Sequence, residues 1–395
     1  MSALGAIARR GASHPGGAIQ AAISITQSVR HPMLAAAPDL SRVFDMCDGI
    51  GMLRRVDGVG PHRAAAYWLD DNARALMLMN VATGLNAPDR AQWAITFAAF
   101  LQQCWSEEKG AFIPFLGCDR NWRDDEEAED SSGRALWALG HTIECAPCPE
   151  LRRWALDWYE KVLPCCTGFH SPRASAFVML GAAARLRAGP DHALSRTVLQ
   201  DGADFLHRLL GGSRRPDWAW FEAVLGYDNP RLSQALIEAG LVLECRSDIE
   251  AGIETLEWAA TQQISANGHF QPVATDAING SRDRLPFDQQ PLDAQAAIDA
   301  ARAAYSATGN IRWLDHAQAA WAWFFGVNDS GRIPADIGSS HCFRGINAHS
   351  SPETTIAFHL AYYSMSGLAQ TQQEALQHVA GGEAATGFEE RRSRS

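Results

Sequence analysis

The strongest constraint on the fold is a pattern that recurs six times along the chain: a polar turn with Asp, Ser or Pro, then a helix rich in Ala and Leu. Asp and Ser are favoured helix caps because their oxygens accept the free N–H groups of the first turn, and Pro suits the first helical position. The copies begin 41 to 63 residues apart, which leaves room for a second helix in each interval. They occur at residues 71–84, 129–143, 170–186, 227–243, 287–305 and 350–365.

A second type of helix fills the intervals between these copies. It is amphipathic, with apolar residues at helical spacing and charge on the opposite face, whereas the capped helices carry little charge and many small residues. The amphipathic helices are expected at residues 89–105, 149–163, 195–211, 247–264 and 311–325, with a further one near 17–30. The capped helices are therefore predicted to be buried and the amphipathic ones to cover them.

Six buried helices alternating with six amphipathic ones predict an all-α (α/α)6 toroid, with an inner and an outer ring. An open solenoid is the alternative, but a period of about 56 residues exceeds the roughly 33–47 of common two-helix repeats. We expect one toroid domain over residues 1–380, in which 1–45 are peripheral, and a disordered tail at 381–395.

Composition and charge exclude several classes of function. The chain has 395 residues, 47% of them hydrophobic, and a net charge of −11 without a long basic run, which argues against nucleic acid or an anionic membrane as partner. No apolar stretch reaches the roughly 20 residues that a membrane-spanning helix needs. The first 25 residues lack a secretory pattern, so a cytoplasmic protein is expected.

The nine cysteines do not form a recognisable metal or disulfide framework. An odd number scattered over a long chain favours reduced thiols. Cys145 and Cys148 form one CxxC pair, but Cys165 and Cys166 are adjacent rather than a second such pair. We therefore expect buried or incidental thiols, no metal and no cofactor.

Acidic residues accompany most of the turns that precede the buried helices. In a toroid these helices run the same way, so their N-termini converge at one mouth, where their partial positive charge favours carboxylates. Capping, or ion pairs of Arg74 and Arg134 with the residues four positions earlier, would explain any single acid. Together they supply the paired carboxylates that cleavage of a glycosidic bond requires. The acids in question are Asp70, Asp71, Glu129, Asp130, Asp228, Asp288 and Glu353.

Long aromatic loops lead into the same turns, and ordered loops on a rigid scaffold commonly carry function. They cover residues 109–122, 214–229, 266–280 and 331–347. Trp68, Trp122, Trp218 and Trp220 lie in or beside such segments and could stack on sugar rings, or simply pack the mouth. Glu222 lies in a loop rather than at a cap, so capping does not account for it.

A string of motifs resembles a known group of proteins: YWLDDNARAL, EDSSGRALWALG, SPRASAF, WFE…LGYDNPRL, FDQQPLDA and NAHSSPETTIAF. Over about residues 65–365 the chain resembles the six-hairpin glycosidase superfamily, and in particular bacterial helical domains associated with glycosyltransferases and mannoside processing. The resemblance implies an (α/α)6 toroid that acts on glycans with two mouth carboxylates. It also implies that the chain works alone or with a separate glycosyltransferase.

The first functional hypothesis is a glycoside hydrolase or transglycosidase that acts on an oligosaccharide. Its candidate catalytic acids are Asp71, Asp130, Glu222 and Asp288. The candidate substrate-binding residues are Asp70, Arg74, Trp122, Glu129, Arg134, Arg173, Trp218, Trp220, Asp228, Asn229, Gln289, Gln290 and His341.

Two alternatives stay open. A sugar epimerase or isomerase of the N-acylglucosamine 2-epimerase type would move protons with histidines, for which His269, His341 and His349 are candidates. A non-catalytic glycan-binding partner of a glycosyltransferase would keep the aromatic residues but hold every mouth acid in a salt bridge.

Overall fold

The computed structural model describes residues 34, 36–54, 66–123, 128–273, 289–331, 333, 335–336, 339–340 and 351–371. Pro38–Ser364 form one compact unit, and the architecture below is that of its described residues. The other unit comprises Met1–Ala37 and Met365–Ser395, of which residues 365–371 are helical.

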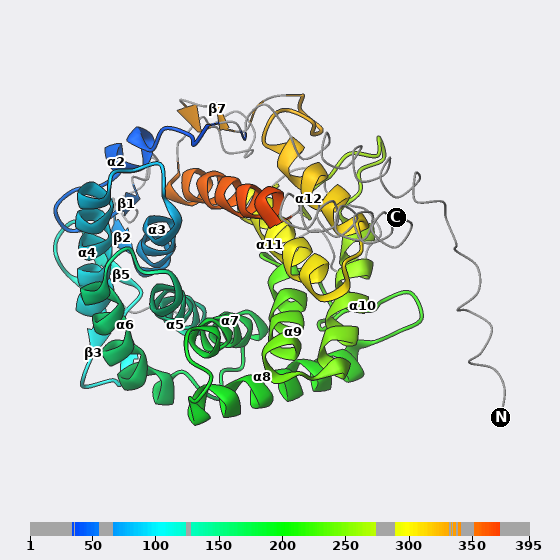
Figure 1. Ribbon diagram of the computed structural model, residues 1–395, viewed down its shortest axis with the longest axis horizontal. Helices are drawn as coiled ribbons and strands as arrows, with labels where there is room; N and C mark the ends of the chain where they lie inside the picture. The colour runs from blue at the N-terminus through cyan, green and yellow to red at the C-terminus, as the bar shows by residue number, and fades with distance from the viewer. Residues whose placement is uncertain are drawn as a thin grey trace, which may run out of the picture. The chain divides into compact units, whose positions relative to one another are not determined.

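An inner set of helices surrounds a common centre in the unit Pro38–Ser364 (Figure 1). It consists of α3 (Leu69–Val81), α5 (Ala128–Cys145), α7 (Pro172–Ala188), α9 (Pro230–Leu243), α11 (Pro291–Thr308) and the helix that starts at residue 352. These helices are buried almost all round; in α11 every residue from Pro291 to Ala301 is buried. The predicted inner ring is confirmed.

An outer set of helices covers the inner one. It consists of α4 (Ala87–Gln103), α6 (Pro149–Val162), α8 (Ala193–Ser213), α10 (Arg246–Gln262) and α12 (Arg312–Trp323). Each buries one stripe only, as α6 does with Leu151, Ala155, Tyr159 and Val162. The alternation confirms the (α/α)6 fold, while the outer helix expected near 17–30 lies outside the described residues.

Small residues let α5 and α7 approach each other closely. A Cβ added to Gly140 would lie 2.2 Å from the carbonyl oxygen of Gly181, and one added to Gly133 would lie 2.6 Å from that of Ala174. Since two helix backbones meet at these points, no larger side chain fits between them. The small residues of the capped helices thus set the width of the inner ring.

A small antiparallel sheet leads the chain into α3. Its strands β1 (Leu53–Arg54), β2 (Ala66–Trp68), β5 (Phe115–Gly117) and β6 (Trp122–Arg123) pair in that order. In the register of β2 and β5, Tyr67 lies opposite Leu116. The Leu69 amide then donates to the Pro114 carbonyl at 2.9 Å, which fixes the start of α3.

Shorter elements complete the connections of the unit. They are α2 (Ser41–Asp45), the 3₁₀ helix η2 (Leu163–Cys165), and the two-stranded pairs β3 (Trp105–Ser106) with β4 (Ala111–Phe112) and β7 (Ala335–Asp336) with β8 (Ser339–Ser340). Among the described residues, no helix is long and apolar enough to cross a bilayer.

The starts of the inner helices correct the capping prediction in part. Ser171 does cap α7, because its side chain accepts from the Ala174 amide. In α3 the cap position is Trp68, and Asp70 and Asp71 are the second and third helical residues. The aspartate pair therefore sits inside the first turn, where the helix dipole favours it and its oxygens can reach neighbouring helices.

Candidate functional site

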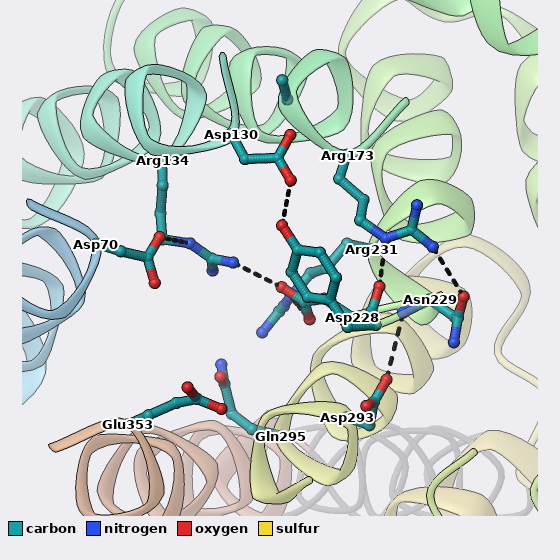
Figure 2. Close-up of polar contacts among 12 residues, drawn as sticks. Asp70, Asp130, Arg134, Arg173, Asp228, Asn229, Arg231, Asp293, Gln295 and Glu353 are labelled. Carbon is teal, nitrogen blue, oxygen red and sulfur yellow. Dashed lines mark hydrogen bonds and ion pairs between the residues drawn. The ribbon is translucent and has the colours of Figure 1, made fainter. Parts of the chain in front are cut away.

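The N-terminal turns of the inner helices meet in one group of charged side chains, which we call the N-terminal cluster (Figure 2). Its members are Arg54, Asp70, Asp71, Arg74, Asp130, Arg134, Arg173, Tyr227, Asp228, Asn229, Arg231, Asp293 and Glu353. The convergence predicted from helix direction is confirmed. Contacts join α3 to α5, α7 to the start of α9, and that start to α11, while Glu353 of the last inner helix lies beside Arg54, the partner of Asp71 on α3.

Arg134 on α5 lies at the middle of the cluster. It forms ion pairs with Asp70 of α3 and, at 3.1 Å, with Asp228 just before α9. Its guanidinium also lies 4.0 Å above the ring of Phe177. The alternative of an ion pair between Arg134 and Asp130 on the same helix is not found among the described residues: the partners come from neighbouring helices that closure of the ring brings near.

Asp228 is fully buried between two arginines. One oxygen accepts from Arg134 and the other from Arg231 at 3.2 Å. Asp228 also adopts the left-handed backbone conformation, with φ of 52°. Most residues avoid this conformation, so the surrounding structure must hold Asp228 in it. Asp228 in turn fixes the positions of Arg134 and Arg231.

Besides Asp130, which is partly exposed, the acids of the cluster that solvent can still reach are Asp70 and Glu353. Their side chains are 25% and 27% exposed, and both border the open centre between the helices in Figure 2. Burial of the two carboxyls raises the pKa of both Glu353 and Asp70. Nearby arginines lower these pKa values, Arg74 for Glu353 and Arg134 for Asp70, but the effect of burial is larger. These two carboxyls are therefore available to a ligand and able to hold a proton.

Asp71 is closed off from solvent. Its side chain is fully buried, and Arg54 donates to both of its oxygens, at 2.7 and 2.9 Å. The same Arg54 Nη2 lies 3.5 Å from a Glu353 oxygen. Asp71 thus anchors Arg54, and Arg54 links the start of α3 to Glu353.

Glu129 and Asp130 brace the start of α7. The backbone amides of His170 and Ser171 both donate to Glu129 Oε2 at 2.9 Å. Asp130 accepts from the hydroxyls of Ser171 and Tyr227. Burial, with the Asp130 charge beside it, raises the pKa of the Tyr227 phenol well above its ordinary value, so Tyr227 stays a donor.

Glu222 is held by Arg173, at 3.0 Å from its Nη1. Arg173 also donates to the Asn229 side chain, and Asn229 in turn accepts from the Gly226 amide at 3.0 Å. These contacts order the loop before α9 rather than leaving Glu222 free in the centre.

Asp293 is a buried acid that the sequence analysis did not select. Its Oδ1 accepts from the Asn229 amide at 3.3 Å, while its Oδ2 has no hydrogen-bond partner among the described residues. Burial, and then the Asp228 charge, raise the pKa of Asp293 well above its ordinary value. A signal did exist: Asp293 is the third residue of its helix, as Asp71 and Asp130 are of theirs.

The other residues missed by sequence reasoning are Arg54, Tyr227 and Arg231. Arg231 follows the first-position Pro230 of its helix as Arg173 follows Pro172, so the local pattern could have found it. Arg54 lies in the two-residue strand β1 and Tyr227 in the loop before α9, and neither segment carries a periodic signal.

The tryptophans of the mouth serve mainly as packing. Trp220 is fully buried and stacks on Trp258 of α10 at 5.7 Å, and Trp218 meets the same ring edge-on. Trp122 on β6 is 37% exposed, next to Phe100. Trp68 packs edge-on against Phe115 and lies 4.2 Å from the Arg54 guanidinium.

The remaining predicted residues lie at the other side of the mouth or outside the described part. Gln289 accepts from the Trp323 indole at 2.9 Å and donates to Asp329, and Gln290 is the cap residue of α11. His269 pairs with the same Asp329, Nε2 to Oδ1 at 2.9 Å. Asp288, His341 and His349 are outside the described residues.

The described cysteines are free thiols. Within the described ranges, no group of three or more His, Cys, Asp or Glu side chains is arranged to hold a metal ion.

Comparisons with solved structures find a similar fold in several enzymes whose names refer to carbohydrates. Cellobiose 2-epimerase from Bacillus thermoamylovorans superposes with a TM-score of 0.62 at 13% identity, over 88% of this chain and 100% of that one. A D-mannose isomerase gives a TM-score of 0.62 at 11% identity, over 91% and 100%. A glycoside hydrolase family 76 mannosidase from Bacteroides thetaiotaomicron gives 0.52 at 10% identity, over 90% and 100%.

These similarities establish the (α/α)6 toroid. No protein-family model and no curated protein sequence matches the chain.

Proposed function

We propose that the chain is a glycan-active enzyme that hydrolyses or transfers a glycosidic bond with two carboxyl groups, Glu353 as general acid and Asp70 as base or nucleophile. The observation that carries the proposal is that these two acids, alone in the cluster, combine a raised pKa with side chains about a quarter exposed. An acid in a water-poor site keeps its proton until a leaving oxygen takes it.

The surrounding residues fit supporting roles. Asp71 holds Arg54 against Glu353, and Arg134 touches Asp70, so each proposed catalytic acid has an arginine beside it. Of the acids selected from sequence, Asp71 is fully buried and takes two hydrogen bonds from Arg54, and Glu222 pairs with Arg173 in the loop before α9, so we assign both to positioning. Asp130 keeps a role in ordering Tyr227.

A purely glycan-binding role is less well supported. That hypothesis requires every mouth acid to be in a salt bridge. Asp130 is held by hydroxyl groups and Asp293 by a backbone amide, and neither has an ion-pair partner among the described residues. An acid whose pKa is raised by burial, as that of Asp293 is, is typical of catalytic centres.

Sugar epimerisation is the second candidate, because one mouth histidine is oriented by a carboxylate. His269 is bonded to Asp329, which also accepts from Gln271 and Gln289, so its ring is fixed as a proton-transfer group would be. The solved epimerase and isomerase structures share this fold.

Isotope incorporation separates the two chemistries. Purified protein is incubated with a panel of manno- and gluco-oligosaccharides in H₂¹⁸O and, separately, in D₂O. Hydrolysis places ¹⁸O at a new reducing end, whereas epimerisation places deuterium on the carbon next to the carbonyl group. Deuterium exchange without bond cleavage would overturn the hydrolase proposal.

Substitutions then test the assigned residues. Glu353→Gln and Asp70→Asn are expected to lower turnover by about 10²- to 10⁴-fold. Glu250→Gln, an exposed acid on α10, is the control and should keep full activity. His269→Ala should leave cleavage intact; if it abolishes activity and Glu353→Gln does not, the epimerase assignment takes over.

A further inference from the structure

Arg74 is a buried cation whose two terminal nitrogens find no acceptor in the part of the chain that the structure describes. It lies in the second turn of α3 and is 1% exposed, yet neither its Nη1 nor its Nη2 has a hydrogen-bond acceptor among the described residues. The other arginines of the N-terminal cluster all contact carboxylates: Arg54 with Asp71, Arg134 with Asp70 and Asp228, Arg173 with Glu222, and Arg231 with Asp228 and Asp299.

The guanidinium of Arg74 lies below the proposed catalytic acids. Arg74 follows Asp70 by four residues on the same helix, so it occupies the same face one turn further in. The charges that act on it are Arg134, Glu353, Asp70 and Asp228, all members of the cluster. Arg74 is therefore buried next to Asp70 and Glu353, the proposed catalytic acids.

An unpartnered buried charge destabilises a fold, and here the neighbouring Arg134 adds repulsion. Burial, and then Arg134, lower the pKa of Arg74. Such a departure from ordinary packing is expected where a ligand supplies the missing partner.

The chemistry of the group identifies that partner. A guanidinium presents a planar fork of N–H donors that matches the two oxygens of a carboxylate or phosphate. A sugar hydroxyl would take one donor but leave the buried charge uncompensated. We propose that Arg74 binds an anionic group of the substrate, so that the enzyme acts on an acidic sugar such as a uronic acid or a sugar phosphate. The sugar part of this inference rests on the proposed function, whereas the anion site rests on Arg74.

The charges that face this site are compatible with an anion. Asp70 is compensated by Arg134, and Asp228 lies between Arg134 and Arg231. Glu353 lies beside Arg54 and has a raised pKa, and in its protonated form it adds no negative charge that would oppose the anion.

Ligand-induced thermal shifts test the inference without requiring turnover. The probes are glucuronate, galacturonate, glucose 6-phosphate and inorganic phosphate, each compared with neutral glucose and galactose at the same concentration and ionic strength. At least one acidic sugar should raise the midpoint temperature of thermal unfolding, whereas neutral sugars should not. Comparison of the uronates with the phosphate probes shows which of the two anion types is bound. Equal or larger shifts with the neutral sugars would overturn the inference.

Arg74→Met provides the second test. Because it removes an uncompensated charge, it should raise the midpoint of the unliganded protein and abolish the shift with acidic sugars, while Arg74→Lys keeps part of that shift. Arg208→Met, an exposed arginine on α8, should change neither. A lower midpoint for unliganded Arg74→Met would mean that Arg74 is structural, and would contradict the proposal.

The two proposals can fail separately. If no glycan is cleaved but the Arg74-dependent preference for acidic sugars is found, the anion site stands and the hydrolase proposal falls. If neutral glycans are cleaved by a reaction that needs Glu353, and their binding does not depend on Arg74, the hydrolase proposal stands and the anion site falls.

Discussion

Arg134 and Asp228 form a buried ion pair at 3.1 Å although 94 residues separate them in the chain. Neither side chain is more than 2% exposed, and Asp70 lies on the other side of the guanidinium. The pair therefore joins α3, α5 and the start of α9, and fixes the position of a proposed catalytic acid.

Arg134→Met should be strongly destabilising. It leaves the buried Asp228 with Arg231 alone, and removing one partner of a buried pair costs about 3–5 kcal/mol. The free energy of unfolding in urea measures the loss. Arg246→Met, which breaks the exposed pair with Glu250 on α10, should cost under about 0.5 kcal/mol. Equal losses for the two variants would show that the cluster is not a stabilising unit.

Asp293→Asn should make stability less sensitive to pH. The unfolded carboxyl ionises near its ordinary pKa of 3.8, but the folded one, with its raised pKa, keeps its proton to higher pH. The folded state therefore binds more protons above pH 3.8, and wild-type stability falls as the pH rises through that window. Asparagine keeps the acceptor for the Asn229 amide without the charge.

The variant should consequently be more stable than wild type at pH 7, with the difference vanishing near pH 3. Urea midpoints at the two pH values measure this, with Asp204→Asn on the exposed face of α8 as control. A variant that is less stable than wild type at pH 7 would show that Asp293 is needed as a carboxylate.

Gly140→Ala should disrupt the packing of α5 against α7. The new Cβ would lie 2.2 Å from the Gly181 carbonyl oxygen, so the backbones must separate, at a cost of about 1–3 kcal/mol or more. Gly211→Ala is the matched control: this glycine lies in α8 with nothing within 4 Å of the new Cβ. It should stabilise the protein by about 0.5–1 kcal/mol, because alanine is the better helix former. Thermal midpoints that move in the same direction would contradict this account.

Thiol labelling should divide the cysteines by burial. Cys118 and Cys165 are exposed and should react with a maleimide in the native protein. Cys104 and Cys166 are buried, and burial raises the pKa of Cys166 to about 12, so both should react only after unfolding. Peptide mass spectrometry identifies the labelled positions, and rapid native labelling of Cys104 would be inconsistent with this packing.

The sequence by itself determined the alternation of buried and amphipathic helices, and with it the ring and the gathering of acids at one end. Periodicity, small residues and Pro or Ser at helix starts are local signals, and the common direction of the inner helices follows from the alternation. The acids at Asp70, Asp130 and Glu353 were therefore predictable as neighbours.

Only the tertiary structure decided what each of these side chains does. Asp71 and Asp70 are adjacent in sequence, yet one is buried against Arg54 and the other borders the open centre. Arg74 and Arg134 follow acids by the same four residues, yet Arg134 finds two carboxylates and Arg74 none among the described residues. The partners lie on other helices, and their placement depends on how the ring closes, which no local pattern encodes.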